Sequence, residues 1–218
     1  MTNATLRIFS GLTLGVLSTA SPASIVSFVS NEASLVGSSG VSFEGAVQWT
    51  PGSGSSGVLE LTITNTTGGS VGGYLTGLAF NLGGHSASVA LVSAGGLDFV
   101  GIADVNAEPF GHAFAAGAAL GGNWQGGGRP QGGLASGQTG VFTFAVTGEN
   151  VDLLESASIF EGPYDYDFVA RFRGLADGGS SKVAGAITGV PEIPAPGSAA
   201  LMAAGLGIAA RRRRPALV

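Results

Sequence analysis

Apolar and polar side chains alternate along several short segments in the middle of this chain. In the segment VLELTITN, residues 58–65, Leu59, Leu61 and Ile63 share one side, and the side chains between them are acidic or hydroxylic. A period of two is that of a β-strand with one face in a core. Similar patterns predict further strands at residues 25–30, 41–49, 74–82, 89–93, 97–103, 141–147, 156–160, 166–173 and 182–188.

Two stretches between these segments lack the alternation. Residues 110–120 are rich in alanine, the best helix former, and we expect a short helix there although Gly111 and Gly117 oppose it. Residues 121–140 contain many glycines and predict a long loop. Despite its glycines this loop is not a phosphate-binding P-loop, because it lacks the required lysine and hydroxyl residue.

The chain contains 39 glycines, without a Gly-X-Y repeat, and no cysteine. Glycines that separate short strands are typical of an all-β domain with many turns. Residues 24–189 are long enough for one domain with its own core. We therefore predict a single antiparallel β-sandwich of jelly-roll-like form. Its predicted core contains Leu59, Leu61, Ile63, Phe80, Phe142, Phe144, Phe168 and Phe172.

Charged residues make up only 11% of the chain, and their positions matter more than their number. Residues 24–189 carry thirteen acidic side chains but only four basic ones, which are Arg129, Arg171, Arg173 and Lys182. Binding to nucleic acid needs clustered lysine and arginine. We therefore expect no nucleic acid partner for this acidic region.

The first 23 residues have the three parts of a secretory signal peptide. Arg7 supplies a positive charge, residues 8–17 form an apolar stretch, and Ala20 and Ala23 each end a run of small residues. We predict cleavage after Ala23, with Ala20 as the alternative, and export by Sec-type machinery. The other interpretation of this segment is an N-terminal core strand or helix.

The C-terminus also has the form of a targeting signal. An apolar run at residues 197–210 is shorter, at about 1.5 Å per residue, than the ~30 Å hydrocarbon core of a membrane. Such a length suits a transient membrane stop, with the following arginines in the cytoplasm. A buried terminal helix with a basic tail is the alternative. The residues that define the signal are Val190, Pro191, Glu192 and Pro194 before the run, and Arg211, Arg212, Arg213 and Arg214 after it; residues 215–218 form a short tail.

These C-terminal residues resemble a PEP-CTERM sorting signal, in which a Pro-Glu-Pro motif precedes a transmembrane segment and a basic end. The resemblance covers residues 190–214 and departs from the family at Ile193, where the second proline belongs. It implies processing by a membrane protease-transferase called exosortase, in a Gram-negative bacterium that makes exopolysaccharide and biofilm. The middle region is also similar to that of other exported proteins with this signal, down to the run at residues 167–173.

Histidines and carboxylates are the first candidates for chemistry. His85 and His112 have no metal-ligand spacing, so we expect local hydrogen bonds, although a Ser-His-Asp triad can assemble in space.

Oxygen-rich loops can hold Ca²⁺, but no calcium-loop ligand series is present, so we predict solvated acids and no cofactor. The sequence alone indicates no carboxylate pair for a glycosidase. The acidic residues that fall close together are Asp98, Asp104 and Glu108, and Glu161, Asp165 and Asp167 beside Tyr164 and Tyr166.

Trp124 and Arg129, both on the predicted long loop, are the candidates for ligand contact. A tryptophan face can pack against a sugar ring. The alternative is that Trp124 folds back and covers the sandwich.

These observations favour a non-enzymatic protein, exported to the bacterial cell surface or the extracellular matrix. A carbohydrate-binding module for exopolysaccharide is the second hypothesis, and a secreted hydrolase is the third. Exposed aromatic side chains would favour sugar binding, whereas a cleft with convergent His, Asp or Glu would favour an enzyme. These hypotheses can be distinguished by where four aromatic side chains point, which are Trp49, Trp124, Tyr164 and Tyr166.

Overall fold

The computed structural model describes residues 24–189, apart from residues 39, 53, 84–86, 111–112, 156–158, 161–165 and 167. Within the described residues the chain forms β-strands and two short 3-10 helices, but no α-helix. No helix in this part of the chain has the length and apolarity that a membrane crossing requires. The prediction of an all-β domain is therefore confirmed for the described residues.

Eleven strands make up the sheet. They are β1 (Ser24–Gly37), β2 (Phe43–Pro51), β3 (Ser56–Asn65), β4 (Gly72–Phe80), β5 (Ala87–Ser93), β6 (Phe99–Asn106), β7 (Ala113–Leu120), β8 (Leu134–Ala135), β9 (Thr139–Gly148), β10 (Phe168–Leu175) and β11 (Ser180–Gly189). The two 3-10 helices are η1 (Pro130–Gly132) and η2 (Val151–Leu153).

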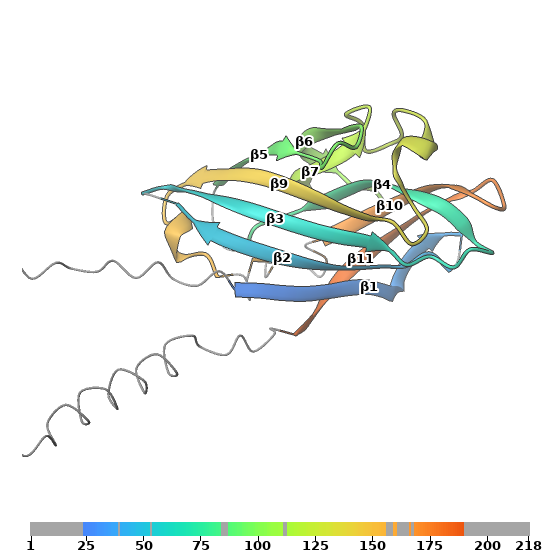
Figure 1. The fold of residues 1–218 in the computed structure, drawn as a ribbon, viewed down its shortest axis with the longest axis horizontal. Coiled ribbons are helices and arrows are strands. Elements are labelled where there is room, and N and C mark those ends of the chain that lie inside the picture. Colours follow the sequence, from blue (N-terminus) through green and yellow to red (C-terminus); the bar gives the residue numbers. More distant parts are fainter. Residues whose placement is uncertain are drawn as a thin grey trace, which may run out of the picture.

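The strands form one antiparallel sheet in the order β5-β9-β3-β2-β1-β11-β10-β4-β7-β6, with β8 paired to β4. The end strands approach each other, since a Cβ atom on Gly101 of β6 would lie 3.0 Å from the Cβ of Leu91 on β5. The two halves of the sheet face each other as layers (Figure 1). The structure differs from the predicted sandwich of separate sheets, because β1 and β11 pair and make the sheet continuous and nearly closed.

Aromatic rings fill the space between the two layers. Phe144 of β9 meets Phe80 of β4 with ring centroids 5.0 Å apart, and Phe142 meets Phe99 of β6 at the same separation. Edge-to-face pairs of this kind stabilise a core beyond the area that they bury. The predicted core is confirmed, since its members are all buried: Leu59, Leu61, Ile63, Phe80, Phe142, Phe144, Phe168 and Phe172.

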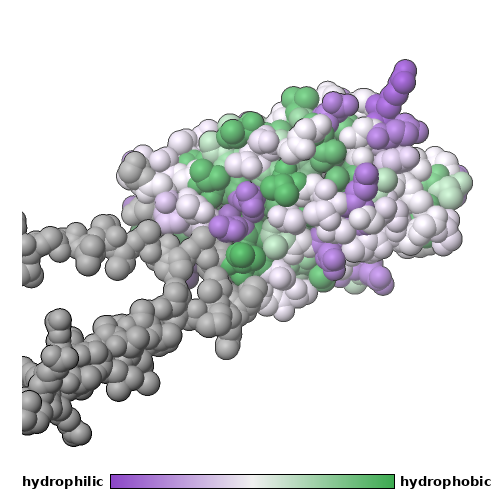
Figure 2. Space-filling model, viewed as in Figure 1, coloured by the Kyte–Doolittle hydropathy of each residue, from purple (hydrophilic) through white to green (hydrophobic). Residues whose placement is uncertain are grey.

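The outer face of β3 and β9 is mostly polar, as their alternation predicts. Glu60 is exposed, and the hydroxyl groups of Thr64 and Thr139 form a hydrogen bond of 2.8 Å across the two strands. Val58 and Val141 are apolar exceptions on these strands. On the face seen in Figure 2, apolar patches are separated by polar side chains.

The first and last strands, β1 and β11, pair along most of their length. The register shifts between Asn31 and Val36, where β1 departs from regular pairing. Two buried hydroxyl groups lie there: the backbone N–H of Ala184 donates to Oγ of Ser34 at 2.8 Å, and Oγ of Ser181 donates to the carbonyl of Val36 at 3.1 Å. These bonds satisfy backbone groups that the irregular ladder would leave without partners.

Residues 113–120 form strand β7, and the predicted short helix at residues 110–120 is wrong. The backbone of β7 passes so close to β4 that a Cβ atom on Gly117 would lie 2.2 Å from the carbonyl oxygen of Leu78. Small side chains on β7 permit this approach. Packing between strands therefore overrides the helix propensity of alanine.

Two other predicted elements also differ from the structure. Residues 121–140 are not one loop, because they contain η1, β8 and the first residues of β9. Ile159 and Phe160 form a buried turn instead of the end of a strand, and residues 156–158 lie outside the described residues. The other predicted strands are present, with most ends shifted by one to three residues, but β1 continues to Gly37, well beyond its predicted end at residue 30.

Asp177 organises the turn between β10 and β11. Its carboxylate accepts hydrogen bonds from the Ser38 side chain and from the backbone N–H of Gly179, the latter at 2.8 Å. These bonds favour the charged form and lower the pKa of Asp177 below its ordinary value of 3.8. The turn thereby holds the segment after β1 against the hairpin of β10 and β11.

Truncation of Phe144 tests the assignment of the interior. The ring is fully buried, so Phe144→Ala should lower the free energy of unfolding by about 3–5 kcal/mol. Thr143→Ala, at the next outward position of β9, is the control and should cost much less. Denaturant unfolding measures both variants. Equal losses would mean that the two faces of β9 are assigned the wrong way round.

Substitution of Asp177 should change how stability depends on pH. Because the pKa is lowered on folding, the charged carboxylate stabilises the fold above its unfolded pKa, and this contribution is lost as the pH falls through the folded pKa. Asp177→Asn should therefore lower the melting temperature at neutral pH, with a difference from wild type that shrinks below about pH 4. Melting curves at several pH values measure this; a constant difference would contradict it.

Candidate functional site

A second group of buried side chains lies on the outer face of the layer that contains β4, β10 and β11. Ala79, Val169 and Ala184 alternate along their strands with residues of the interior core, so they point outward. Other side chains cover them, which are Val105, Ala107, Phe114 and Trp124 and, partly buried, Ile102, Phe110 and Tyr166. This outer face is therefore covered, unlike that of β3 and β9.

Trp124 lies at the centre of this covering layer. Its side chain is only 4% exposed. The indole packs against β4 at Gly77, where an added Cβ atom would lie 3.4 Å from Cε3 of the ring. Gly121, Gly122 and Gly126 around it adopt positive φ angles, which glycine accepts without strain. The loop at residues 121–128 thus folds Trp124 back onto the sheet, and this ring is not an exposed sugar platform.

Two arginines on the outward side of β10 hold this loop. Arg171 donates a hydrogen bond to the carbonyl oxygen of Trp124. Arg173 donates to the carbonyl oxygens of Gly127, at 2.8 Å, and Gly128, at 3.4 Å. The positions of these carbonyls therefore depend on two charged side chains two residues apart on one strand.

Lys182 of β11 lies directly opposite Arg171 in the β10–β11 ladder. It donates to the carbonyl oxygen of Glu108, in the segment after β6. Burial lowers the pKa of Lys182, and Arg171 lowers it further, whereas Glu108 raises it. Burial and the neighbouring Arg173 also lower the pKa of Arg171. Both effects disfavour the charged forms, because the cations are partly removed from water and close to each other.

Arg129 is exposed and directly precedes η1. Pro130 of η1 lies near the end of β10, since a Cβ atom on Gly174 would be 3.2 Å from the Pro130 Cβ. All four basic residues of the region at residues 24–189 are therefore on β10 or on segments beside it. We call Arg171, Arg173 and Lys182 the cationic cluster.

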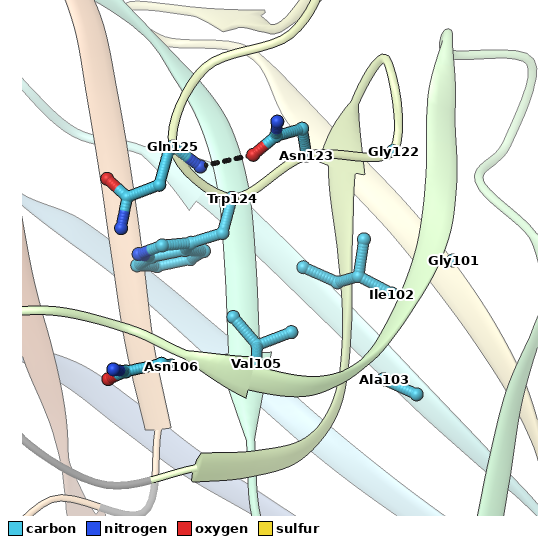
Figure 3. A pocket seen from close by; sticks show the side chains of 9 residues that line it. All are labelled: Gly101, Ile102, Ala103, Val105, Asn106, Gly122, Asn123, Trp124 and Gln125. Atoms are coloured by element: carbon cyan, nitrogen blue, oxygen red, sulfur yellow. Dashed lines mark hydrogen bonds between the residues drawn. The ribbon is translucent and has the colours of Figure 1, made fainter.

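A groove of about 450 Å³ lies between β6 and the loop that carries Trp124. Figure 3 shows the indole of Trp124 between the side chains of Gln125 and Asn106. Asn123 also lines the groove, and its Oδ1 accepts the backbone N–H of Gln125 at 2.8 Å. The described lining contains no charged side chain, so it offers no acid–base pair for hydrolysis.

Two buried nitrogen atoms next to the groove make no hydrogen bond within the described residues. They are Nε1 of Trp124 and Nε of Arg171. Both groups can only donate. An unpaired buried donor costs free energy, so each of these nitrogen atoms lacks an acceptor that would stabilise it.

The structure separates the two predicted ligand contacts, Trp124 and Arg129. Trp124 lines the groove, whereas Arg129 is not among the lining residues. Trp49 is a core residue that is 3% exposed, and Tyr166 packs edge-to-face on Phe110 with ring centroids 5.5 Å apart. The described members of the aromatic set are therefore packed into the fold. A ligand role for Trp124 and Arg129 stays a prediction.

The described carboxylates do not gather into a metal site. Asp98 lies near Gly132 of η1, Asp104 adopts a positive φ of 50° in β6, and Glu108 accepts a hydrogen bond from Nδ2 of Asn106 at 3.2 Å. Among the residues described, no three His, Cys, Asp or Glu side chains are grouped so that they could hold a metal ion. The second acidic group, Glu161, Asp165 and Asp167, lies outside the described residues, as do Tyr164, His85 and His112.

Residues 68–72, GGSVG, match a Gly-x-Ser-x-Gly pattern, but they join strand β3 to strand β4. The turn is closed by a hydrogen bond of 2.9 Å from the backbone N–H of Val71 to the carbonyl of Gly68. A nucleophile elbow connects a strand to a helix. Ser70 therefore lies in a connection between two strands that are not neighbours in the sheet, and not in a nucleophile elbow.

The cationic cluster is the feature that the sequence analysis did not identify. A signal for it was present, because Arg171 and Arg173 flank the inward-facing Phe172 on one strand. Side chains two positions apart on a strand point to the same face of the sheet. The position of Lys182 opposite Arg171 follows only from the pairing of β10 with β11, which the sequence pattern does not contain.

Comparisons of this chain with known protein families, with curated proteins and with solved structures found no match. The site is therefore interpreted from the geometry of this chain. The similarity to a PEP-CTERM signal stays a prediction, because residues 190–218 and the expected signal peptide at residues 1–23 lie outside the described residues.

The environment of Trp124 can be tested by fluorescence. Both tryptophans are buried, so we expect blue-shifted emission that acrylamide quenches weakly. The variant Trp49→Phe isolates the emission of Trp124 and should keep both properties. Emission like that of free tryptophan, with strong quenching, would show that the ring is exposed and would restore the sugar-platform hypothesis.

Proposed function

We propose that this chain is an exported bacterial protein that is sorted by its C-terminal PEP-CTERM-like signal to the cell surface or the extracellular matrix. Residues 24–189 are the part that acts outside the cell. The segments before and after it direct export and sorting. In this proposal its molecular role is a non-enzymatic one.

The observation that carries this proposal is the form of the two terminal segments in the sequence. Arg7, the apolar residues 8–17 and Ala23 follow the order of a signal peptide, and the apolar run at residues 197–210 is followed by four arginines. Ser27 and Gly189 are partners in the ladder. Residues near the two ends of the described range therefore lie side by side in one sheet.

The steps of sorting follow from the physical properties of the two terminal segments. Sec-type machinery would export the chain until the apolar run at residues 197–210 enters the membrane, where the arginines at residues 211–214 resist translocation. An exosortase-type enzyme would then cut on the outer side, near Pro191 and Glu192. The acidic domain would be released outside, after only transient membrane association.

Carbohydrate binding is the second candidate function. The groove beside Trp124 favours it, because amide side chains and uncharged walls suit the hydroxyl groups of sugars. A secreted hydrolase gains no support from this groove, for lack of an acid–base pair.

Mass spectrometry of the protein from its native cell tests the proposed processing. The mature chain should begin at Ser24 or Ser21 and should lack the arginines at residues 211–214. A mature mass that includes these arginines would mean that the C-terminal segment is a permanent anchor or is not a signal.

Replacement of the arginines at residues 211–214 by serine tests the topology separately. If the charges stop translocation, the variant should pass through the membrane and escape processing. The variant Ile193→Pro, which restores the family motif, is the matched control and should be processed at least as well as wild type. Unchanged sorting of the serine variant would refute this role of the arginines.

A further inference from the structure

We propose that the cationic cluster and the adjoining groove form a binding site for a carboxylated polysaccharide. Arg171, Arg173 and Lys182 hold its carboxylates, and the groove beside Trp124 holds a neighbouring sugar ring. This inference rests on carbohydrate binding, the second candidate function, and names the chemical class of the polymer; it does not depend on how the chain is sorted.

The first argument is the placement of charge. Three of the four basic side chains of residues 24–189 occupy adjacent outward positions, in a region with thirteen acidic side chains. Arg171 is directly opposite Lys182, and Arg173 is two residues further along the same face. Like charges at such positions repel each other. Bound anions would offset this repulsion.

The hydrogen bonds of these three side chains go to backbone carbonyl oxygens, and among the described carboxylates Glu108 interacts with Lys182 through its charge. Arg171 and Arg173 donate to carbonyl oxygens of the loop at residues 124–128, and Lys182 donates to the carbonyl oxygen of Glu108. Within the described residues, no carboxylate accepts a hydrogen bond from them. A carboxylate is a stronger partner for a guanidinium or ammonium group than a carbonyl oxygen. It can therefore compete with the loop for the same donors.

The second argument is the pair of buried donors without acceptors. Nε1 of Trp124 and Nε of Arg171 belong to residues that are joined by a hydrogen bond, since the Arg171 guanidinium donates to the backbone carbonyl of Trp124. The Trp124 side chain is 96% buried, being only 4% exposed. Two donors that lack an acceptor fit a group that only accepts, which is the property of a carboxylate.

The third argument is the character of the groove. Asn106, Asn123 and Gln125 present amide groups, which both donate and accept hydrogen bonds, as sugar hydroxyls require. Gly101 and Gly122 add no side chains to the walls. The volume of about 450 Å³ is that of a small-ligand site. Uncharged space beside a charged row matches a polymer in which neutral rings carry carboxylates.

The same observations disfavour two other polyanions. Nucleic acids and anionic membranes present dense negative charge over a wide area. The many acidic side chains of this domain would repel such a surface. A polysaccharide strand is narrow enough to contact the cationic cluster and the groove alone.

Calorimetric titration of the full 218-residue chain in mild detergent tests the proposal. Polygalacturonate is the probe, and its methyl ester, which keeps the rings but lacks the charge, is the matched control. We expect binding of polygalacturonate that weakens as salt is added, and binding of the ester at least tenfold weaker. Equal binding of the two polymers, or no binding of polygalacturonate, would overturn the proposal.

Variants assign the binding to this face. Arg173→Gln and Lys182→Gln should each weaken binding by about tenfold, the loss expected for one charge-assisted hydrogen bond. Arg173→Lys retains the charge and should bind more tightly than Arg173→Gln. Melting curves verify that each variant is folded, and the comparison of the two polymers needs no variant. Wild-type affinity in both glutamine variants would overturn the assignment.

Vesicles of anionic lipid test whether the partner is a membrane surface instead of a polysaccharide. Tighter binding to such vesicles than to polygalacturonate, lost in Arg173→Gln, would show that the cationic cluster contacts a membrane surface and would overturn the polysaccharide proposal. Because none of these measurements involves processing, their failure would leave the sorting hypothesis unaffected. Equally, a mature protein that retains its C-terminus would not change the binding result.

Discussion

The pairing of the first strand with the last is the constraint on which the rest of the structure depends. β1 and β11 stand between the two layers in the strand order, so their ladder makes one sheet from what would otherwise be two. Inside, aromatic pairs such as Phe80 with Phe144 connect strands that are distant in that order. The ladder sets how the layers face each other, and the rings fill the space that this leaves. The buried hydroxyl groups of Ser34 and Ser181 maintain the ladder where its register shifts.

The two outer faces of the sheet have different roles because their side chains differ. The face of β3 and β9 carries threonine and glutamate and contacts water. The face of β10 and β11 is covered by a glycine-rich loop, whose carbonyl oxygens are held by Arg171 and Arg173. The Trp124 ring rests on the sheet beside Gly77 of β4. Scarce positive charge is thus concentrated beside the Trp124 ring and the backbone carbonyls of this loop.

Local alternation was sufficient to predict most strands and the inward direction of residues such as Phe142 and Phe168, because the direction of a side chain repeats every two residues. It could not predict that Ala113–Leu120 is a strand, since alanine there serves a close approach to β4. It also could not predict one continuous sheet, which depends on a pairing between opposite ends of the domain. For the site, Trp124 stood out as a residue type, but its burial depends on contacts with β4 and β10 that the local sequence does not encode.

The ladder between β1 and β11 also determines when the chain can finish folding. Its partners, such as Phe28 and Ile187, are separated by almost the whole length of the domain. Contacts of such separation make folding slow, because the entropy of a long loop is lost before any pairing compensates for it. A nascent chain that lacks β11 cannot form this ladder. A chain that emerges from the ribosome N-terminus first therefore stays incompletely folded until its last strand is made, which is the condition in which a protein can be threaded through a narrow export channel.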